Sequence, residues 1–359
     1  MIPQIDVTAW SKRLAFLAAA TGAGFVASFL GIPLPWMIGP LLLTGAVGLS
    51  NVKIPLHPAY RPIGQLIVAT AVGLYFTPAA LHEVVAQAGL MIGAAVLTIA
   101  AGIVTAILLY RLTRCDGTVA FFASMPGGPA EMAVLAERWG APGAPVIFAQ
   151  TLRIVFIVLS IPAGLVFLAG LTPPDIRPTA DVYVPGLVLL YALAAAGTVI
   201  LNRIGVPNCN FLGPLAVAAL ISAVGFELSG VPMPLLAAGQ IILGIALGSR
   251  FTRDQFRRDQ KFAVACVFTT VVLLLQCAAV AIGLWLLAGD RALPSYLLAT
   301  APGSVTEMAL TAKLLAQGVA MVTAYHLVRI FIIIPLAPLL YRVFRYTLRD
   351  RVEFGEPAE

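Results

Sequence analysis

The chain has 359 residues, of which 60% are hydrophobic and 11% are charged, and its mean hydropathy is +0.97. Soluble domains average about 45–50% apolar and about 25% charged residues, so this composition excludes a water-soluble enzyme and indicates an integral membrane protein. The net charge of +6 does not indicate nucleic-acid binding, because the cations lie in short loops between apolar runs, where they orient a chain in the bilayer.

Six hydrophobic elements follow one another in the first half of the chain. They cover roughly residues 13–30, 33–50, 62–77, 88–110, 115–140 and 143–170. We interpret the first as a retained helix rather than a cleaved signal peptide, because the apolar run after Lys12 and Arg13 leads straight into the next hydrophobic segment.

The fifth element is predicted to be broken in its middle. Its centre, Ser124-Met-Pro-Gly-Gly-Pro129, holds two prolines and two glycines, which cannot continue a helix. The piece 116–124 would be about 14 Å long, or half of a hydrocarbon core of about 30 Å. The element is therefore either a re-entrant hairpin or a broken spanning helix, and the stretch 300–305 presents the same alternative in the second half.

The second half of the chain repeats the first. The matching pairs are Gly31-Ile-Pro33 with Gly205-Val-Pro207, Gly39-Pro40 with Gly213-Pro214, Gly64-Gln65 with Gly239-Gln240, Glu131 with Glu307, and Arg153 with Arg329. The spacing between paired positions stays nearly constant from the first pair to the last, which indicates a duplication. We predict one membrane repeat at residues 1–172, a linker at 173–179, a second membrane repeat at 180–348 and a cytoplasmic tail at 349–359.

The placement of the loop cations favours an inverted duplication. A hairpin gives each repeat five spanning helices and inverts the second repeat, whereas a spanning broken helix gives six and keeps the repeats parallel. The hairpin arrangement places most loop cations on the cytoplasmic side, and the alternative divides them more evenly, so the positive-inside rule favours hairpins. We predict an all-α polytopic protein of the plasma or bacterial inner membrane, with ten spanning helices, two hairpins and both termini in the cytoplasm.

Three motifs of the chain resemble the membrane AbrB family. They are Gly-Ile-Pro-Leu-Pro-Trp-Met-Ile-Gly-Pro at 31–40, Ser-Met-Pro-Gly-Gly-Pro-Ala-Glu-Met at 124–132 and Ala-Pro-Gly-Ser-Val-Thr-Glu-Met at 301–308. The resemblance covers nearly the whole chain. It implies a duplicated membrane domain that is related to cation/proton antiporters and anion transporters, in a family whose members often carry the labels ammonia monooxygenase or regulator.

The residues themselves argue against both labels as direct activities. An ammonia monooxygenase needs a cluster of metal ligands, but His57, His82 and His326 are far apart in the sequence. The cysteines show no C-x-x-C spacing, which argues against a zinc site and a disulfide framework. Direct DNA regulation would need a basic reading module, and no soluble stretch is long enough for one. We therefore expect no enzyme activity, no cofactor, no metal and no nucleic-acid partner.

Inverted repeats whose discontinuous elements meet near the membrane midplane are the usual plan of secondary transporters. We predict a proton-coupled or Na⁺-coupled transporter that moves a small anionic or zwitterionic solute by alternating access. A cation/proton antiporter and a membrane protein with a regulatory role in gene expression are the alternatives. The expected partners are a small-molecule or ion substrate and membrane lipid, and a homo-oligomer stays open.

Glu131 and Glu307 follow the two breaks and are the first candidates for an ion site. A charge near mid-membrane is costly and is therefore a functional candidate by default. Helix capping is the alternative, because 304–307 has the Ser-x-x-Glu spacing of a capping box and Pro129 stands at a first helical position just before Glu131. The two roles can coexist at one carboxylate.

Arg153 and Arg329 lie inside the sixth element of each repeat and need partners there. We favour a structural ion pair with Glu131 or Glu307, which would neutralise both charges. The alternative is a clamp for an anionic substrate, which would use the planar guanidinium fork.

The remaining candidates for ion or substrate contacts are small or polar residues at or near these elements. They are Ser124, Gly127, Gly128, Thr300, Gly303, Ser304, Thr306, Gln65, Gln240, Asn208 and Asn210. The same residue types also hold membrane helices together through close packing and interhelical hydrogen bonds, which is the alternative for each of them.

Overall fold

The computed structural model describes residues 7–50, 57, 59–171, 182–251, 253, 259–288 and 292–348. All regular structure in these ranges is helical, and none of these residues forms a strand. The predicted all-α class is therefore confirmed for this part of the chain. The predicted linker at 173–179 and the predicted tail at 349–359 lie outside the described residues.

The chain divides into two compact units, and each unit takes segments from both halves of the sequence. The first unit comprises Met1–Thr77 and Asp175–Phe256, and the second comprises Pro78–Pro174 and Arg257–Glu359. Each unit is described separately below.

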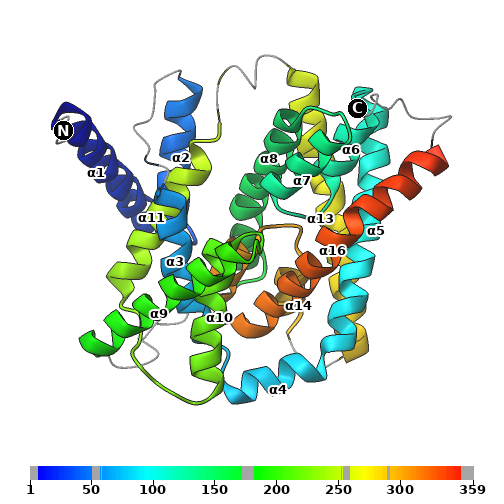
Figure 1. Cartoon of the computed structure of the whole chain (residues 1–359). Helices are drawn as coiled ribbons and strands as arrows, with labels where there is room; N and C mark the ends of the chain where they lie inside the picture. The colour runs from blue at the N-terminus through cyan, green and yellow to red at the C-terminus, as the bar shows by residue number, and fades with distance from the viewer. Residues whose placement is uncertain are drawn as a thin grey trace. The chain divides into compact units, whose positions relative to one another are not determined.

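In the described residues, the first unit contains six helices (Figure 1). They are α1 (Val7–Phe29), α2 (Pro35–Leu49), α3 (Tyr60–Gly73), α9 (Val184–Arg203), α10 (Cys209–Ala223) and α11 (Met233–Gly248). Helix α2 packs against α1 and α11, and α10 packs against α9 and α3. A Cβ atom added to Gly39 of α2 would collide with the carbonyl oxygen of Ala23 in α1, so these two backbones are in direct contact. Small residues allow such contacts in membrane proteins, where burial of apolar surface does not drive helix association.

The second unit holds the two broken elements. Its helices are α4 (Pro78–Ala86), α5 (Ala88–Thr113), α6 (Gly117–Ser124), α7 (Pro129–Arg138), α8 (Gly143–Ala163), the π-helical turn Gly164–Leu168, α13 (Gln260–Ala288), α14 (Leu293–Thr300), α15 (Val305–Leu314) and α16 (Val319–Leu348). Helix α6 packs against α5 and α8, and α14 packs against α13 and α16. The two short helices that precede the breaks are therefore each held between two longer ones.

The predicted breaks are confirmed. Helix α6 ends at Ser124 and α7 begins at Pro129, while α14 ends at Thr300 and α15 begins at Val305. The Asp116 side chain caps the start of α6 by accepting a hydrogen bond from the Thr118 amide at 2.6 Å. Each broken element thus consists of two short helices joined by an irregular segment.

The local structure repeats along the chain in step with the sequence duplication. Helices α6 and α7 begin at Gly117 and Pro129, and α14 and α15 begin at Leu293 and Val305, the equivalent positions of the second repeat. Leu34 and Asn208 are also equivalent positions. Both have the left-handed backbone conformation, with φ of 52° and 55°, immediately before α2 and α10. The duplication therefore extends to unusual backbone angles.

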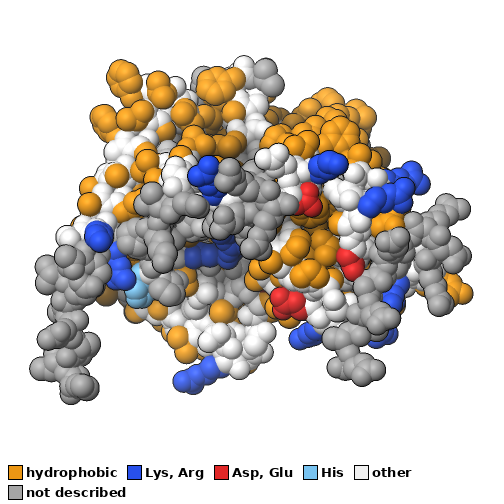
Figure 2. Space-filling view, turned by 90° about the horizontal axis from the view of Figure 1, so that it is seen from above, with side chains coloured by type: hydrophobic (Ala, Val, Ile, Leu, Met, Phe, Trp, Pro, Cys, Tyr) orange, Lys and Arg blue, Asp and Glu red, His pale blue; other side chains and the backbone are white. Residues whose placement is uncertain are grey.

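Five described helical segments are long and apolar enough to cross a membrane, or six if α3 and α4 form one bent span. The five are α5, Gly143–Phe167, α9, α13 and α16. Helices α2, α10 and α11 are also apolar but shorter. Figure 2 shows broad patches of hydrophobic side chains on one face of the molecule, and many large hydrophobic side chains of the described helices are exposed, as expected for helices that contact lipid. These features support an integral membrane protein, and the number of ten spanning helices stays a prediction.

Candidate functional site

The first break is held by an arginine from the helix that follows it. The last carbonyl groups of α6 have no amide partner within that helix, because the chain leaves helical geometry after Ser124. Arg153 of α8 donates hydrogen bonds from Nη1 to the carbonyl oxygens of Ser124 at 3.2 Å and Met125 at 3.1 Å. The guanidinium also lies at the C-terminal end of α6, where the helix dipole is negative.

The second break has the same arrangement. Arg329 of α16 donates from Nη1 to the carbonyl oxygen of Ala301 at 2.8 Å and from Nη2 to that of Gly303 at 3.0 Å. Both arginines are only 4% exposed. Each guanidinium therefore satisfies the orphan carbonyls of a half-helix inside the protein.

At each break, the hydrogen-bond network of the arginine includes a second buried side chain. This side chain lies one helical turn before the arginine. Gln150 accepts a hydrogen bond from Arg153 Nη2 at 2.9 Å and donates to the carbonyl oxygen of Phe122 at 2.7 Å. His326 occupies the equivalent position in α16, where its Nδ1 lies 2.9 Å from Arg329 Nη2.

The second ring nitrogen of His326 fixes the tautomer of this side chain. Its Nε2 lies 2.9 Å from the carbonyl oxygen of Leu298, the residue equivalent to Phe122. A guanidinium can only donate and a carbonyl can only accept, so the geometry requires a neutral imidazole with its hydrogen on Nε2. His326 and Gln150 therefore make the same pair of hydrogen bonds with different chemical groups.

The prediction of an ion pair between an arginine and a glutamate is wrong. Within the described ranges, no hydrogen bond or ion pair joins Arg153 or Arg329 to Glu131 or Glu307, and neutral carbonyl oxygens take the place of the carboxylates. The four Nη atoms are all engaged, which leaves only the buried Nε atoms of the two arginines without a hydrogen-bond partner among the described residues. The guanidinium groups therefore hold backbone carbonyls in this structure, and the anion clamp stays a prediction.

Glu131 and Glu307 occupy the third position of α7 and α15, in the first turn after each break. Glu307 is 9% exposed, and its Oε2 atom is buried without a hydrogen-bond partner among the described residues. Glu131 is half-buried, and its carboxylate folds back over the backbone of Gly128. The hydroxyl of Ser304, the N-cap residue of α15, makes no capping hydrogen bond. The two glutamates thus share a position but differ in burial.

The other predicted site residues fall into two groups. Ser124, Gly127, Gly128, Thr300, Gly303, Ser304 and Thr306 lie at the two breaks of the second unit. Gln65, Gln240, Asn208 and Asn210 lie in the first unit, where the Gln65 amide donates to the Asn208 side-chain oxygen at 3.2 Å. This bond joins α3 to Asn208 at the N-cap position of α10, whose side chain makes no capping hydrogen bond, which agrees with the helix-packing alternative.

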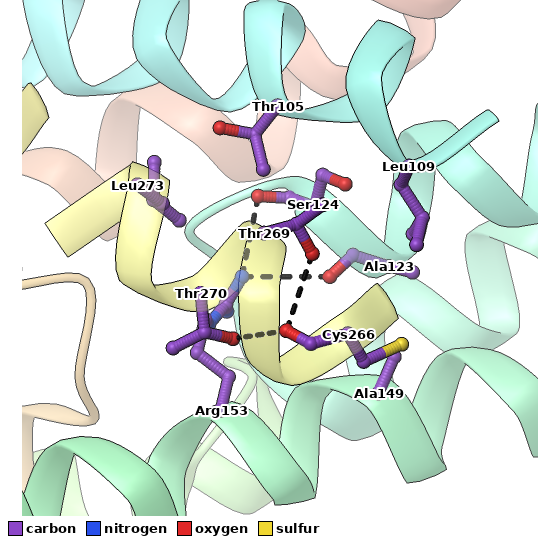
Figure 3. A pocket seen from close by; sticks show the side chains of 10 residues that line it. All are labelled: Thr105, Leu109, Ala123, Ser124, Ala149, Arg153, Cys266, Thr269, Thr270 and Leu273. Carbon is purple, nitrogen blue, oxygen red and sulfur yellow. Dashed lines mark hydrogen bonds between the residues drawn. The ribbon is translucent and has the colours of Figure 1, made fainter. Parts of the chain in front are cut away.

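A small pocket adjoins the first break, and residues from four helices of the second unit line it (Figure 3). They are Thr105 and Leu109 of α5, Ala123 and Ser124 of α6, Ala149 and Arg153 of α8, and Cys266, Thr269, Thr270 and Leu273 of α13. No group of three or more His, Cys, Asp or Glu side chains that could hold a metal ion occurs in the described part of the chain.

The sequence did not identify Gln150, His326 or the threonines of the pocket as site residues. The sequence did contain a signal for Gln150 and His326. Each lies one helical turn before an arginine of the duplication, on the same helix face, so Gln150 and His326 are themselves equivalent positions. The three threonines carry no such signal, since they come from α5 and α13 at unrelated positions.

Comparisons with known proteins agree with the motifs of the sequence. A family model described as "Transition state regulatory protein AbrB" matches residues 36–345. The chain is 24% identical to the "Uncharacterized protein YhjN" of Bacillus subtilis (strain 168), over 93% of this chain and 94% of that protein. It is 22% identical to the "Putative regulator AbrB" of Escherichia coli (strain K12), over 94% of this chain and 97% of that protein. Because the family model spans most of its length, this chain belongs to the AbrB family.

Proposed function

We propose that this AbrB-family membrane protein is a secondary active transporter, which couples a proton or Na⁺ gradient to the movement of a small anionic or zwitterionic solute. The observation that carries the proposal is the pair of breaks in the second unit, each held by a buried arginine and each followed by a glutamate. Irregular backbone at membrane depth is tolerated only inside protein or beside a water-filled cavity. Half-helix ends at that depth typically form the ion and substrate sites of transporters.

The helix contacts recur between the two repeats, which supports a duplicated structure, and the inversion of the second repeat rests on the positive-inside rule. In the first unit, α2 packs against α11 as its equivalent α10 packs against α3. In the second unit, the contacts of α5 with α6 and of α7 with α8 recur between α13 and α14 and between α15 and α16. We infer ten spanning helices with both termini in the cytoplasm of a bacterial cell, which requires α1, α2, α3, α10 and α11 to cross the membrane in addition to the five candidate spans. Two gates of opposite orientation would then serve alternating access.

The glutamates are the proposed ion sites. The free Oε2 of Glu307 is buried, and a carboxylate oxygen without a partner in such a place calls for a proton or a cation. The N-termini of α7 and α15 carry a partial positive charge that suits the negative group of a solute. The arginines shape both breaks through the carbonyl groups, so their role is to position the half-helices.

A regulatory role is the second candidate, and the printed names of the family model and of the Escherichia coli relative favour it. A membrane sensor would bind a ligand or a partner protein without moving a solute across a sealed bilayer. A cation/proton antiporter that uses the same glutamates is a variant of the first proposal.

Two successive measurements test the proposal. A thermal-shift screen of the purified protein against small carboxylates, amino acids, amines and cations identifies solutes that bind the folded state. Uptake of each stabilising solute into proteoliposomes is then measured with and without an imposed pH or Na⁺ gradient. We expect uptake that the gradient stimulates, whereas binding without uptake under any gradient would support the regulatory role instead.

A further inference from the structure

We propose that the C-terminal ends of α5, α7 and α16 form a docking surface for anionic phospholipids, whose phosphate groups accept hydrogen bonds from Arg114 and Arg342. The proposal assigns a partner to the second unit that is independent of the transport proposed above. Its test therefore needs no transport assay.

Contacts with α16 bring both ends of the first broken element to one place. At its start, Leu348 of α16 packs against a buried cluster that includes Ala120 of α6. At its end, the ring of Trp139, directly after α7, lies 4.9 Å from the ring of Tyr341 in α16. Tyr341 and Leu348 are about two helical turns apart, or roughly 10 Å, which is a third of a hydrocarbon core of about 30 Å. The broken element therefore starts and ends at the same end of the second unit, as a re-entrant hairpin does (Figure 1).

Arginines outnumber carboxylates at these helix ends in the described residues. The arginines are Arg111 and Arg114 of α5, Arg138 of α7, and Arg342 and Arg345 of α16.

The two carboxylates of these segments, Asp116 and Glu137, each face the start of a helix. Asp116 accepts a hydrogen bond from the Thr118 amide at the start of α6, and the carboxylate of Glu137 lies beside Gly143, the first residue of α8. A helix start carries a partial positive charge that favours a carboxylate. The surface thus keeps an excess of positive charge.

Aromatic rings hold two of the arginines in place without using their hydrogen-bond donors. The guanidinium carbon of Arg342 lies 5.7 Å from the centre of the Trp139 ring, and that of Arg114 lies 5.7 Å from the centre of the Tyr110 ring. Both arginines are exposed, and neither makes a hydrogen bond or an ion pair through its side chain with any residue that the structure describes. Their N–H groups are therefore available to a phosphate group, which a guanidinium binds through two parallel hydrogen bonds.

Apolar side chains beside the arginines favour a lipid over an acidic protein as the partner. Leu112, Val343 and Tyr346 stand next to arginines in α5 and α16 and are exposed, Tyr346 to 86%. At a membrane interface such side chains contact acyl chains or lie at the level of the headgroups, while arginines reach the phosphate groups. Basic clusters at this level attract anionic lipids. The same helix ends thus offer contacts to both parts of one lipid molecule.

Thermal unfolding of the purified full-length protein in uncharged detergent tests the proposal. Phosphatidylglycerol or phosphatidylcholine is added to the micelles in rising amounts, for the wild type and for the double variant Arg114→Gln/Arg342→Gln. We expect the unfolding midpoint of the wild type to rise more with phosphatidylglycerol than with phosphatidylcholine, because a ligand that binds the folded state stabilises it. The double variant should need at least tenfold more phosphatidylglycerol for the same rise.

A matched control is available in the first unit. Arg61, in the first turn of α3, and Arg203, in the last turn of α9, are also exposed arginines. Arg61→Gln/Arg203→Gln removes the same charge and should keep the phosphatidylglycerol response of the wild type. Because Arg114 and Arg342 are exposed, the midpoint of their double variant in phosphatidylcholine should lie near that of the wild type and show that the variant is folded.

Two soluble compounds separate the lipid from other anionic partners. Glycerol 3-phosphate and polyglutamate are each added to the protein in phosphatidylcholine micelles, and we expect neither to reproduce the rise. An arginine-dependent rise with either compound that equals the rise with phosphatidylglycerol would assign the surface to a soluble phosphate compound or to an acidic protein, and would overturn the proposal.

The lipid proposal and the transport proposal fail separately. Equal responses of the wild type and the Arg114→Gln/Arg342→Gln variant, or equal effects of the two lipids on the wild type, overturn the lipid surface. An arginine-dependent response in a protein that moves no solute would leave the lipid surface standing and remove transport. Gradient-driven uptake without a specific response to phosphatidylglycerol would do the reverse.

Discussion

The guanidinium groups of Arg153 and Arg329 take the place of the amide donors that a continuous helix would have supplied. The sequence predicted that these two residues lie inside apolar helices and need partners. It could not identify the partners, because backbone carbonyls carry no sequence signal, whereas Glu131 and Glu307 were visible charges of opposite sign. The nature of the contact therefore depended on where each helix breaks, which only the structure gives.

Replacing Arg329 by Met tests whether the guanidinium holds the second break. The change leaves the carbonyls of Ala301 and Gly303 buried without donors, so we expect a loss of roughly 3 kcal/mol in the free energy of unfolding. Arg342 lies on the same helix but is exposed, and Arg342→Met should cost less than about 1 kcal/mol. Thermal unfolding of the purified variants measures both, and equal midpoints would contradict the role assigned to Arg329.

An exchange of equivalent residues tests the role of His326. Because Gln150 makes the same two kinds of hydrogen bond in the first break, His326→Gln should stay within about 1 kcal/mol of the wild type. His326→Leu removes both bonds and leaves buried groups unpaired, which should cost about 1–3 kcal/mol. If the Leu variant unfolds at the same temperature as the Gln variant, the network does not stabilise the break.

At the scale of the elements, hydropathy and the positions of Pro and Gly predicted most helices of the first repeat to within a few residues. The fifth element divides at Ser124 and Pro129 because two prolines and two glycines interrupt it, as the sequence indicated. Helix α4 was not predicted. It has nine residues, none of them buried, so it is too short to be predicted as a membrane-spanning element.

Glycine contacts between helices give a prediction about α1 and α2. An alanine at Gly39 places a Cβ against the backbone of Ala23, so the two helices must separate, at a cost of about 1–3 kcal/mol. Gly22 lies in α1 with no atom within 4 Å of an added Cβ, and Gly22→Ala should be neutral or stabilising by up to about 1 kcal/mol. The difference between the two thermal midpoints measures the packing, and a Gly39→Ala midpoint at or above that of Gly22→Ala would exclude the tight contact.

At the scale of the whole molecule, the duplication was visible in the sequence, but the division into two units was not. Each unit combines segments from both repeats, so Gln65 and Asn208 meet in one unit while Arg153 and Arg329 belong to the other. A sequence orders residues along the chain and does not show which distant helices pack together. The grouping of the candidate site residues therefore required the fold.

The inverted topology predicts the sidedness of two loops. Cysteines placed beside Arg250 and beside Arg291, in a protein whose four native cysteines are replaced, should react with a membrane-impermeant thiol reagent from opposite sides of the membrane. The reaction is followed in intact cells and in inverted vesicles. Labelling of both positions from the same side would exclude the inverted arrangement and with it the two opposed gates.

The most direct test of the central proposal is gradient-driven uptake into proteoliposomes by the wild type, Glu131→Gln and Glu307→Gln, with a solute that stabilises the purified protein. Glutamine keeps the size of the side chain and removes its charge, so a carboxylate that carries the coupling proton or Na⁺ cannot be replaced by it. We predict that stimulation by the gradient is lost in Glu307→Gln, whose carboxylate is buried and has a free oxygen, and reduced in Glu131→Gln. Gradient-stimulated uptake that is unchanged in both variants would contradict the account.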